Sequence, residues 1–182
     1  MQITAGRFKG KKLLYPKKNI RPTMDKVRSA IFNILNANFP ELLNQASVCD
    51  IFCGAGSVGI EALSRGAQSA VFIDNNRLTL QYLRKNLINI PAQVRILAGD
   101  ARVVLKQLEP KQFDFIFLDP PYYKNLITAV LNKIALYQLL KDNGVIVVEH
   151  HKQEKFIVPE RLKLFKQKQY QQTVISILIN KE

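Results

Sequence analysis

The segment Leu118-Asp119-Pro120-Pro121-Tyr122 places a carboxylate, two prolines and an aromatic ring next to one another. Proline fixes its own φ angle and has no N–H, and it keeps the preceding residue out of the helical region. We therefore expect a stiff loop that presents the Asp119 carboxylate, the Pro120 carbonyl and the Tyr122 ring to one small space. Two acceptors and a flat ring suit an aromatic primary amine, which donates two N–H bonds while its base stacks. These three residues are the predicted catalytic residues.

A second constellation combines glycines with a carboxylate further along the chain. Gly54, Gly56 and Gly59 follow the G-x-G-x-x-G spacing between a predicted strand and a predicted helix. Glycines at this spacing permit a tight turn and a close approach of a ligand to the backbone. Asp74 lies 20 residues after Gly54, at the end of the next predicted strand, where it can accept two hydrogen bonds from a ribose diol.

The glycine spacing alone is compatible with NAD or with S-adenosylmethionine. Asp50 precedes the glycines, where its charge would repel a pyrophosphate and attract the ammonium of an aminoacyl group. Asp100 ends the third predicted strand and can reach an adenine amine, although a helix-capping role is the alternative. Acids at three successive strand ends favour S-adenosylmethionine. The predicted cofactor-binding residues are Asp50, Gly54, Gly56, Gly59, Asp74 and Asp100.

Alternating strands and helices must position these loops. Near-continuous apolar strands separated by amphipathic helices indicate a parallel sheet that is covered on both faces. Residues 162–169 and 173–180 predict a terminal antiparallel pair. This order is typical of the class I methyltransferase fold, an α/β fold with a Rossmann-like, mostly parallel sheet of seven strands. The other strands are expected at 47–52, 69–74, 93–98, 113–118 and 144–149, and helices at 58–65, 77–89, 101–107 and 125–140.

The start of the chain is strongly basic. Of a net charge of +13, residues 1–28 contribute +8, because nine Lys and Arg stand against Asp25 alone. Such density indicates a polyanion as partner, the alternative being a solvated basic face. Residues 2–7 and 12–15 predict a β-hairpin with a turn near Lys9-Gly10, followed by a helix from Thr23. The predicted RNA-binding residues are Arg7, Lys9, Lys11, Lys12, Arg21 and Arg28.

Composition bounds the remaining possibilities. A chain of 182 residues with 47% hydrophobic residues predicts one domain with a real core. Without an apolar run of 18 residues or a signal-peptide core, we expect a cytoplasmic protein with no membrane contact. Cys49 and Cys53 are expected to be small buried side chains, and His150 and His151 ordinary residues at a strand end. We predict no metal and a monomer.

Three segments together resemble the bacterial 16S ribosomal RNA guanine-N(2)-methyltransferases of the RsmD type. They are the basic residues 3–13, the segment 21–35 that begins Arg21-Pro22-Thr23, and residues 50–67 with the glycine loop. With the loop at 119–122, the resemblance covers nearly the whole chain, although the last 25 residues match weakly. It implies a class I fold and methyl transfer from S-adenosylmethionine to the exocyclic amine of one guanine.

The resemblance also implies the partner and the organisation of the chain. The substrate would be 16S ribosomal RNA within the small ribosomal subunit or its assembly intermediate. We expect residues 1–22 to form a basic extension that contacts RNA, and residues 23–182 to form the methyltransferase domain.

Three alternatives stay open. A DNA adenine amine methyltransferase shares the loop and the cofactor, but 182 residues leave little room for a target-recognition region. A protein glutamine methyltransferase typically has Asn where Asp119 stands. A catalytically silent RNA-binding or ribosome-assembly module would leave the cofactor motifs without a use. Methyl transfer to each substrate class distinguishes them.

Overall fold

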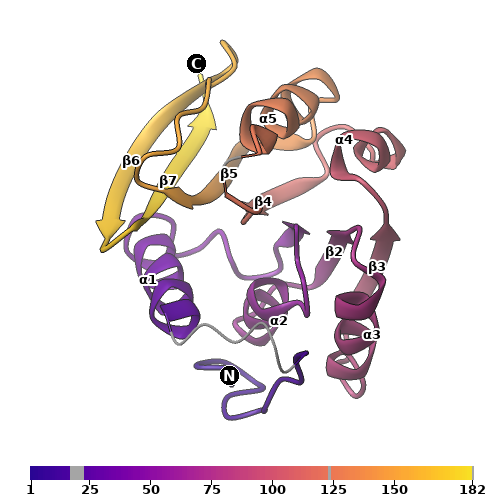
Figure 1. Cartoon of the computed structure of the whole chain (residues 1–182). Coiled ribbons are helices and arrows are strands. Elements are labelled where there is room, and N and C mark those ends of the chain that lie inside the picture. The colour runs from indigo at the N-terminus through magenta and orange to yellow at the C-terminus, as the bar shows by residue number, and fades with distance from the viewer. Residues whose placement is uncertain (17–22, 123, 182) are drawn as a thin grey trace.

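The computed structural model describes residues 1–16, 23–122 and 124–181. Its centre is a seven-stranded sheet in the order β3-β2-β1-β4-β5-β7-β6 (Figure 1). The first five strands of the chain run parallel, β7 is antiparallel to β5, and β6 is antiparallel to β7. The predicted class I fold and its terminal antiparallel pair are confirmed. The strands are β1 (Ser47–Ile51), β2 (Ser69–Asp74), β3 (Gln93–Ala98), β4 (Phe113–Leu118), β5 (Leu140–His151), β6 (Leu162–Tyr170) and β7 (Thr173–Asn180).

Helices cover both faces of the sheet (Figure 1). One face carries α1 (Thr23–Asn38), α2 (Ser57–Ser64) and α3 (Arg77–Asn86). The other carries α4 (Ala101–Val104), the 3-10 helix η1 (Leu105–Gln107) and α5 (Leu126–Leu136). Within the described part of the chain, none of these helices has the length and apolar character needed to cross a membrane.

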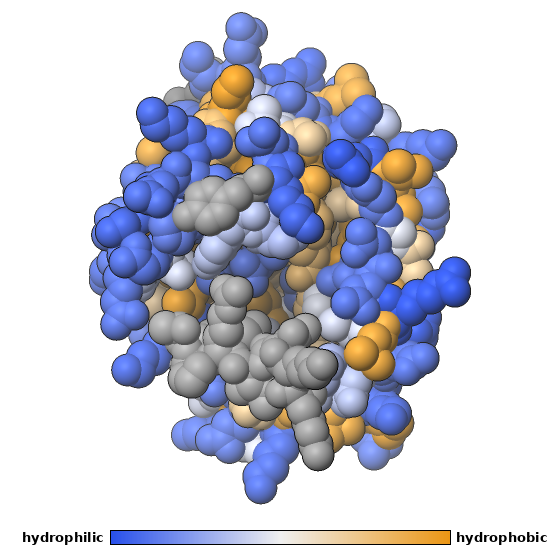
Figure 2. Space-filling view, in the orientation of Figure 1, coloured by the Kyte–Doolittle hydropathy of each residue, from blue (hydrophilic) through white to orange (hydrophobic). Residues whose placement is uncertain are grey.

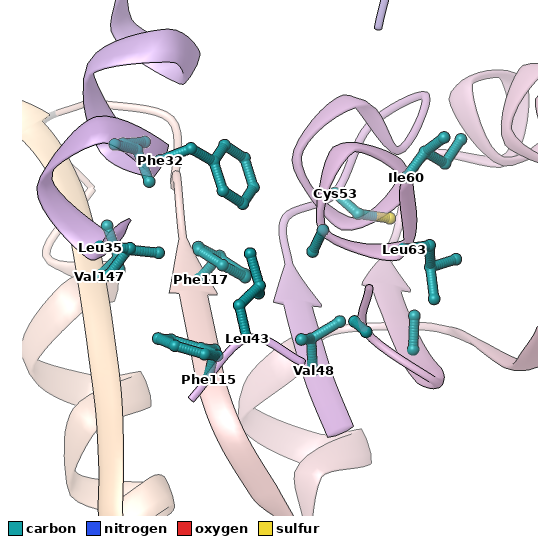
Figure 3. Packing of buried hydrophobic residues seen from close by; sticks show 14 of the residues in the cluster. Phe32, Leu35, Leu43, Val48, Cys53, Ile60, Leu63, Phe115, Phe117 and Val147 are labelled. Atoms are coloured by element: carbon teal, nitrogen blue, oxygen red, sulfur yellow. The ribbon is translucent and has the colours of Figure 1, made fainter. Parts of the chain in front are cut away.

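Burial on both faces of the sheet explains why the sequence of β4 is almost continuously apolar. Phe115 and Phe117 face α1 and α2, where Phe117 lies 5.9 Å from Phe32 between ring centroids (Figure 3). Ile116 and Leu118 point to the opposite face and pack against α5. A strand covered on both sides is apolar at nearly every position. The exception in β4 is Asp114, which is partly buried and forms an ion pair with Lys141.

Two helices end earlier than expected. The helix predicted over 125–140 ends at Leu136, because Gln138 turns the backbone to a φ of 51° and the Leu139 carbonyl accepts the N–H groups of Gln112 and Phe113. β5 therefore begins at Leu140 rather than at residue 144. The helix predicted to residue 89 likewise ends at Asn86.

The predicted N-terminal hairpin is reduced to one antiparallel bridge, between Gln2 and Lys12. The N–H groups that a longer ladder would use are bound to α2 instead. Thr4 donates its backbone N–H to the Glu61 carboxylate at 2.9 Å, and Arg7 donates its backbone N–H to the Ser64 carbonyl at 2.7 Å. Because α2 takes these donors, residues 1–16 lie on the domain as an irregular arm, and we call them the N-terminal arm.

Candidate functional site

The glycine loop and the loop after β4 lie at the point where the strand order reverses. β1 and β4 are neighbours, yet the chain leaves them toward opposite edges of the sheet. Ligands of open α/β sheets bind in the crevice outside the carboxyl ends of the strands at such a point. A cavity of about 420 Å³ lies there, and its lining includes Asp74, Asp100, Asp119 and Pro121.

The glycine loop is shaped by close packing beneath it. Gly56 has a φ of 86°, which disfavours any side chain, and a Cβ there would lie 2.3 Å from the Leu83 side chain. A Cβ on Gly59 would lie 2.4 Å from the Phe72 ring. Gly54 has no atoms within 4 Å of its hypothetical Cβ, so a ligand can approach the backbone there.

Asp50 is buried beneath this loop, with 4% of its surface exposed. Its Oδ2 accepts the Gly59 N–H at 2.8 Å, which ties the end of β1 to the first turn of α2. Burial raises the pKa of Asp50 from 3.8 to about 7, against the lowering effect of the Gly59 bond. The negative charges of Asp119 and Asp74 raise this pKa further.

This raised pKa gives a testable pH dependence. Below about pH 7 the Asp50 carboxyl holds its proton, so it cannot attract an ammonium group. We expect the affinity for S-adenosylhomocysteine, which carries that ammonium, to fall by up to about tenfold per pH unit below 7 and to level off above it. Calorimetric titration from pH 5 to 8 measures this, and Asp50→Asn should flatten the profile.

Folding stability changes with pH in the opposite direction to the ligand affinity. Because the native pKa of Asp50 exceeds its ordinary value, the contribution of this group to stability declines as the pH rises from 3.8 to about 7.

An affinity for S-adenosylhomocysteine that is independent of pH in the unmodified protein would contradict a role for the Asp50 charge.

Asp74 is held by backbone donors on both sides. Its Oδ2 accepts the Gly54 N–H at 2.7 Å and its Oδ1 accepts the Asn76 N–H at 2.8 Å. Asn76 in turn caps α3, accepting from the N–H groups of Leu78 and Thr79. A carboxylate oxygen has two lone pairs, so each oxygen of Asp74 keeps an acceptor site for a ribose hydroxyl.

Asp100 lies in the same cavity and also caps α4. Its side chain accepts the Arg102 N–H at 2.9 Å and forms an ion pair with the Arg102 guanidinium. This pairing lowers the pKa of Asp100 and keeps its carboxylate ionised. Its contact with an adenine amine stays a prediction.

The loop after β4 presents the predicted catalytic residues. Asp119 is exposed, and Pro120 after it is buried. The Tyr122 hydroxyl lies 3.4 Å from the Thr173 hydroxyl, and its ring centroid is 5.7 Å from that of His151. Tyr122 is therefore braced against the ends of β7 and β5, and its role as a stacking platform stays a prediction.

Sequence reasoning missed Phe52 in the cavity wall. Phe52 has a φ of 65°, an unfavourable conformation for a bulky residue. Such strain is typical of functional sites. An aromatic residue between Asp50 and the first glycine is the signal that could have indicated it.

Glu61 is a second residue that the sequence did not reveal, and it fixes the N-terminal arm. It is fully buried. Its oxygens accept the Thr4 N–H at 2.9 Å, the Thr4 hydroxyl at 2.6 Å and the Ala5 N–H at 3.1 Å. It also pairs with Arg65 at 2.8 Å and with Arg28 at 3.5 Å. A glutamate within an apolar helix is the signal that could have indicated this anchor.

Asn86 connects the arm to the glycine loop. Its side chain accepts the Leu14 N–H at 2.8 Å and donates to the carbonyls of Leu14 and Ala55, both at 3.0 Å. Ala55 lies between Gly54 and Gly56, so one buried amide contacts both the arm and the glycine loop.

The predicted RNA-binding residues separate into different environments. Arg7, Lys9 and Lys12 are exposed on the arm. The Lys11 ammonium donates to the Ile88 carbonyl at 2.8 Å, so part of its role is to hold the arm. Arg21 lies outside the described residues.

The prediction for Arg28 is wrong as a direct RNA contact. Only 2% of Arg28 is exposed, because its guanidinium donates to the Gln2 carbonyl at 2.6 Å and to Asp25 at 2.8 Å. Arg28 is a structural link between α1 and the arm. The prediction that Cys49 and Cys53 are buried thiols is confirmed.

The residues present fit S-adenosylmethionine. The cavity volume lies within the range usual for small-molecule sites. The open backbone at Gly54 would allow a close approach, and the doubly held Asp74 would accept the ribose diol. Asp50, buried beneath the loop, would supply a negative charge where it is ionised. A pyrophosphate would meet three carboxylates there.

The sheet order and the cavity at its switch point define a class I methyltransferase fold. Two solved structures share it along their length. The yhhF structure from Escherichia coli aligns with a TM-score of 0.85 at 30% identity, covering 99% of this chain and 97% of that one. HI0767 from Haemophilus influenzae aligns with a TM-score of 0.82 at 31% identity, covering 100% and 98%.

The chain belongs to the family described as conserved hypothetical protein 95, whose model matches residues 1–179. Curated relatives in this group include the ribosomal RNA small subunit methyltransferase D of Haemophilus influenzae, 34% identical over 173 residues, with 92% of this chain and 88% of the relative covered. The protein of that name from Escherichia coli is 34% identical over 151 residues, covering 82% and 74%. The resemblance seen in the sequence is confirmed.

Proposed function

We propose that this protein transfers a methyl group from S-adenosylmethionine to the exocyclic N(2) amine of one guanine in 16S ribosomal RNA. The substrate is the small ribosomal subunit or its assembly intermediate. The observation that carries the proposal is the position of Asp119, which lines one cavity together with Asp74 and Asp100. The names of the relatives support the RNA as substrate.

The chemistry needs alignment more than activation. S-adenosylmethionine supplies an activated methyl group when it is bound. The lone pair of a guanine amine is delocalised into the ring, so the amine is a poor nucleophile. Asp119 and the Pro120 carbonyl would each accept one N–H and turn the lone pair toward the methyl group. Asp119 would then take the departing proton, directly or through water.

The surroundings of the loop match a base that leaves its stack. Tyr122 would stack on the guanine, which is worth about 1–3 kcal/mol. Extruding a stacked base costs a few kcal/mol, and less from a loop, so the balance favours a single-stranded target. Proteins read RNA sequence mainly in such elements.

The exposed lysines of the arm provide a separate prediction. We expect Lys9→Ala with Lys12→Ala to weaken binding to small-subunit RNA and to make its salt dependence shallower by about 1.4, since each phosphate contact on single-stranded RNA contributes about 0.7. Filter binding over a salt series measures the slope. A slope equal to that of the unmodified protein would show that these lysines do not contact phosphates.

Methyl transfer tests the proposal itself. The protein and labelled S-adenosylmethionine are incubated in three parallel reactions, which contain small subunits that lack the modification, DNA, or a protein extract. We expect label only in 16S RNA, mapped by mass to N(2) of one guanine. Label in DNA or protein without label in subunits would reject the proposal, and no label in any substrate would favour a catalytically silent module.

A further inference from the structure

A groove between α1 and the edge strand β6 lies outside the site described above. It has a volume of about 610 Å³, and its walls include Lys26 and Asn33 from α1 and Lys166, Lys168 and Tyr170 from β6. β6 pairs with β7 on one side only, and its residues 163–169 are all exposed. Figure 2 shows hydrophilic side chains gathered on the side of the molecule where β6 lies in Figure 1.

The groove is cationic. Lys26, Lys166 and Lys168 are exposed, and no ion pair of theirs occurs among the described residues. The carboxylate in its lining, Asp25, is neutralised by Arg28 at 2.8 Å. The groove therefore has a net positive charge, because three lysines outnumber its one carboxylate, which is paired with Arg28.

Two of the three lysines of β6, Lys166 and Lys168, lie on the same face of the strand. Alternate residues of a strand point to the same face and lie on the order of 7 Å apart, a spacing comparable to that of successive phosphates in a nucleic-acid strand. Lys166, Lys168 and Tyr170 follow this alternation and line the groove together. The Lys168 ammonium lies 5.4 Å from the Tyr170 ring centroid, so cation and aromatic face are adjacent.

Lys166, Lys168 and Tyr170 extend toward the loop at residues 119–122, which we call the catalytic loop. Tyr170 pairs with Thr173 across β6 and β7, and Thr173 pairs with His151 across β7 and β5. Thr173 and His151 are the residues that brace Tyr122. Tyr170 thus lies at the end of the strands near the catalytic loop, and Lys168 and Lys166 follow from it along the groove.

We propose that this groove binds the sugar–phosphate backbone of the RNA segment flanking the target guanine, with Lys166 and Lys168 contacting phosphates and Tyr170 contacting a base or ribose near the catalytic loop. The proposal rests on the proposed function. Alternating lysines with an adjacent aromatic ring match the chemistry of single-stranded nucleic-acid grooves. The arm and this groove would then hold the RNA from two sides of α1.

The test compares paired variants on small ribosomal subunits that lack the modification. We expect Lys166→Ala with Lys168→Ala to weaken subunit binding about tenfold at 0.1 M salt and to make the salt dependence shallower by about 1.4. The KM for subunits should rise while kcat at saturation and the affinity for S-adenosylhomocysteine stay unchanged. Lys166→Arg with Lys168→Arg should restore binding, because the charges return.

A matched control uses two exposed lysines elsewhere, Lys106 on η1 and Lys181 after β7. Replacing both with Ala removes the same charge and should leave the salt slope as it is, whereas an equal loss would show a non-specific effect and overturn the proposal. Lysines on an edge strand also discourage pairing between sheets. If that were their only role, the groove variant would bind with unchanged slope, and the proposal would fall.

The failure of this proposal and that of the proposed function are distinguishable. If the unmodified protein methylates subunits and the groove variant binds them normally, the proposed role of the groove is rejected and the proposed function stands. Unmodified protein that never methylates subunits would reject the function, whatever the groove variant does.

Discussion

Asp119→Ala should lower kcat for methyl transfer by about 10²–10⁴-fold, the contribution typical of a positioned proton acceptor. At pH 8, above the raised pKa of Asp50, the affinity for S-adenosylhomocysteine should stay nearly unchanged, because the ribose and ammonium acceptors predicted at Asp74 and Asp50 are intact. Single-turnover transfer to small subunits and calorimetric titration measure the two quantities separately.

Two further variants sharpen this result. Asp119→Asn keeps an acceptor oxygen but cannot take a proton, so a kcat between those of the alanine variant and the unmodified protein would separate alignment from proton transfer. Asp142→Ala removes an exposed carboxylate, 78% accessible and paired with Lys111, and should not change kcat. Full turnover in Asp119→Ala would show that the loop only shapes the fold.

Glu61→Ala should reduce the free energy of unfolding by about 3–5 kcal/mol, the cost typical of removing one partner of a buried ion pair. The change leaves the buried Arg28 guanidinium without its partner in α2 and removes the acceptor of the Thr4 and Ala5 N–H groups. Urea unfolding measures the effect.

The exposed Glu109 provides the control for this prediction. Glu109→Ala should change the unfolding free energy by less than about 0.5 kcal/mol, as is usual on a surface. If Glu61→Ala cost no more than that, the arm would be held by apolar contacts such as those of Ile3 and Leu13 in the core, and the carboxylate would be incidental.

The strands and both loops of the site were predictable because their signals are local. Burial on both faces makes the run from Phe115 to Leu118 apolar, and the prolines after Asp119 end the strand. The glycine loop was equally visible, since a side chain at Gly59 would collide with Phe72. Parallel topology then brings separate strand ends to one edge.

Arg28 and Glu61 were not predictable in the same way. Charge density along the chain groups Arg28 with the arm lysines, but burial is decided by packing between α1, α2 and the arm, which lie far apart in sequence. The sequence indicates only the pairing of Arg28 with Asp25, because the two residues are three positions apart on a predicted helix. The hairpin is shorter than predicted for the same reason, because α2 accepts the Thr4 and Arg7 N–H groups.

The Asn86 amide has a thermodynamic consequence. It binds Leu14 in the arm and Ala55 in the glycine loop, so displacing either partner leaves buried donors or acceptors unmatched. We therefore expect an RNA that repositions the arm to change the affinity of the proposed S-adenosylmethionine site. Because linkage is reciprocal, occupancy of that proposed site should change the affinity for RNA by the same factor.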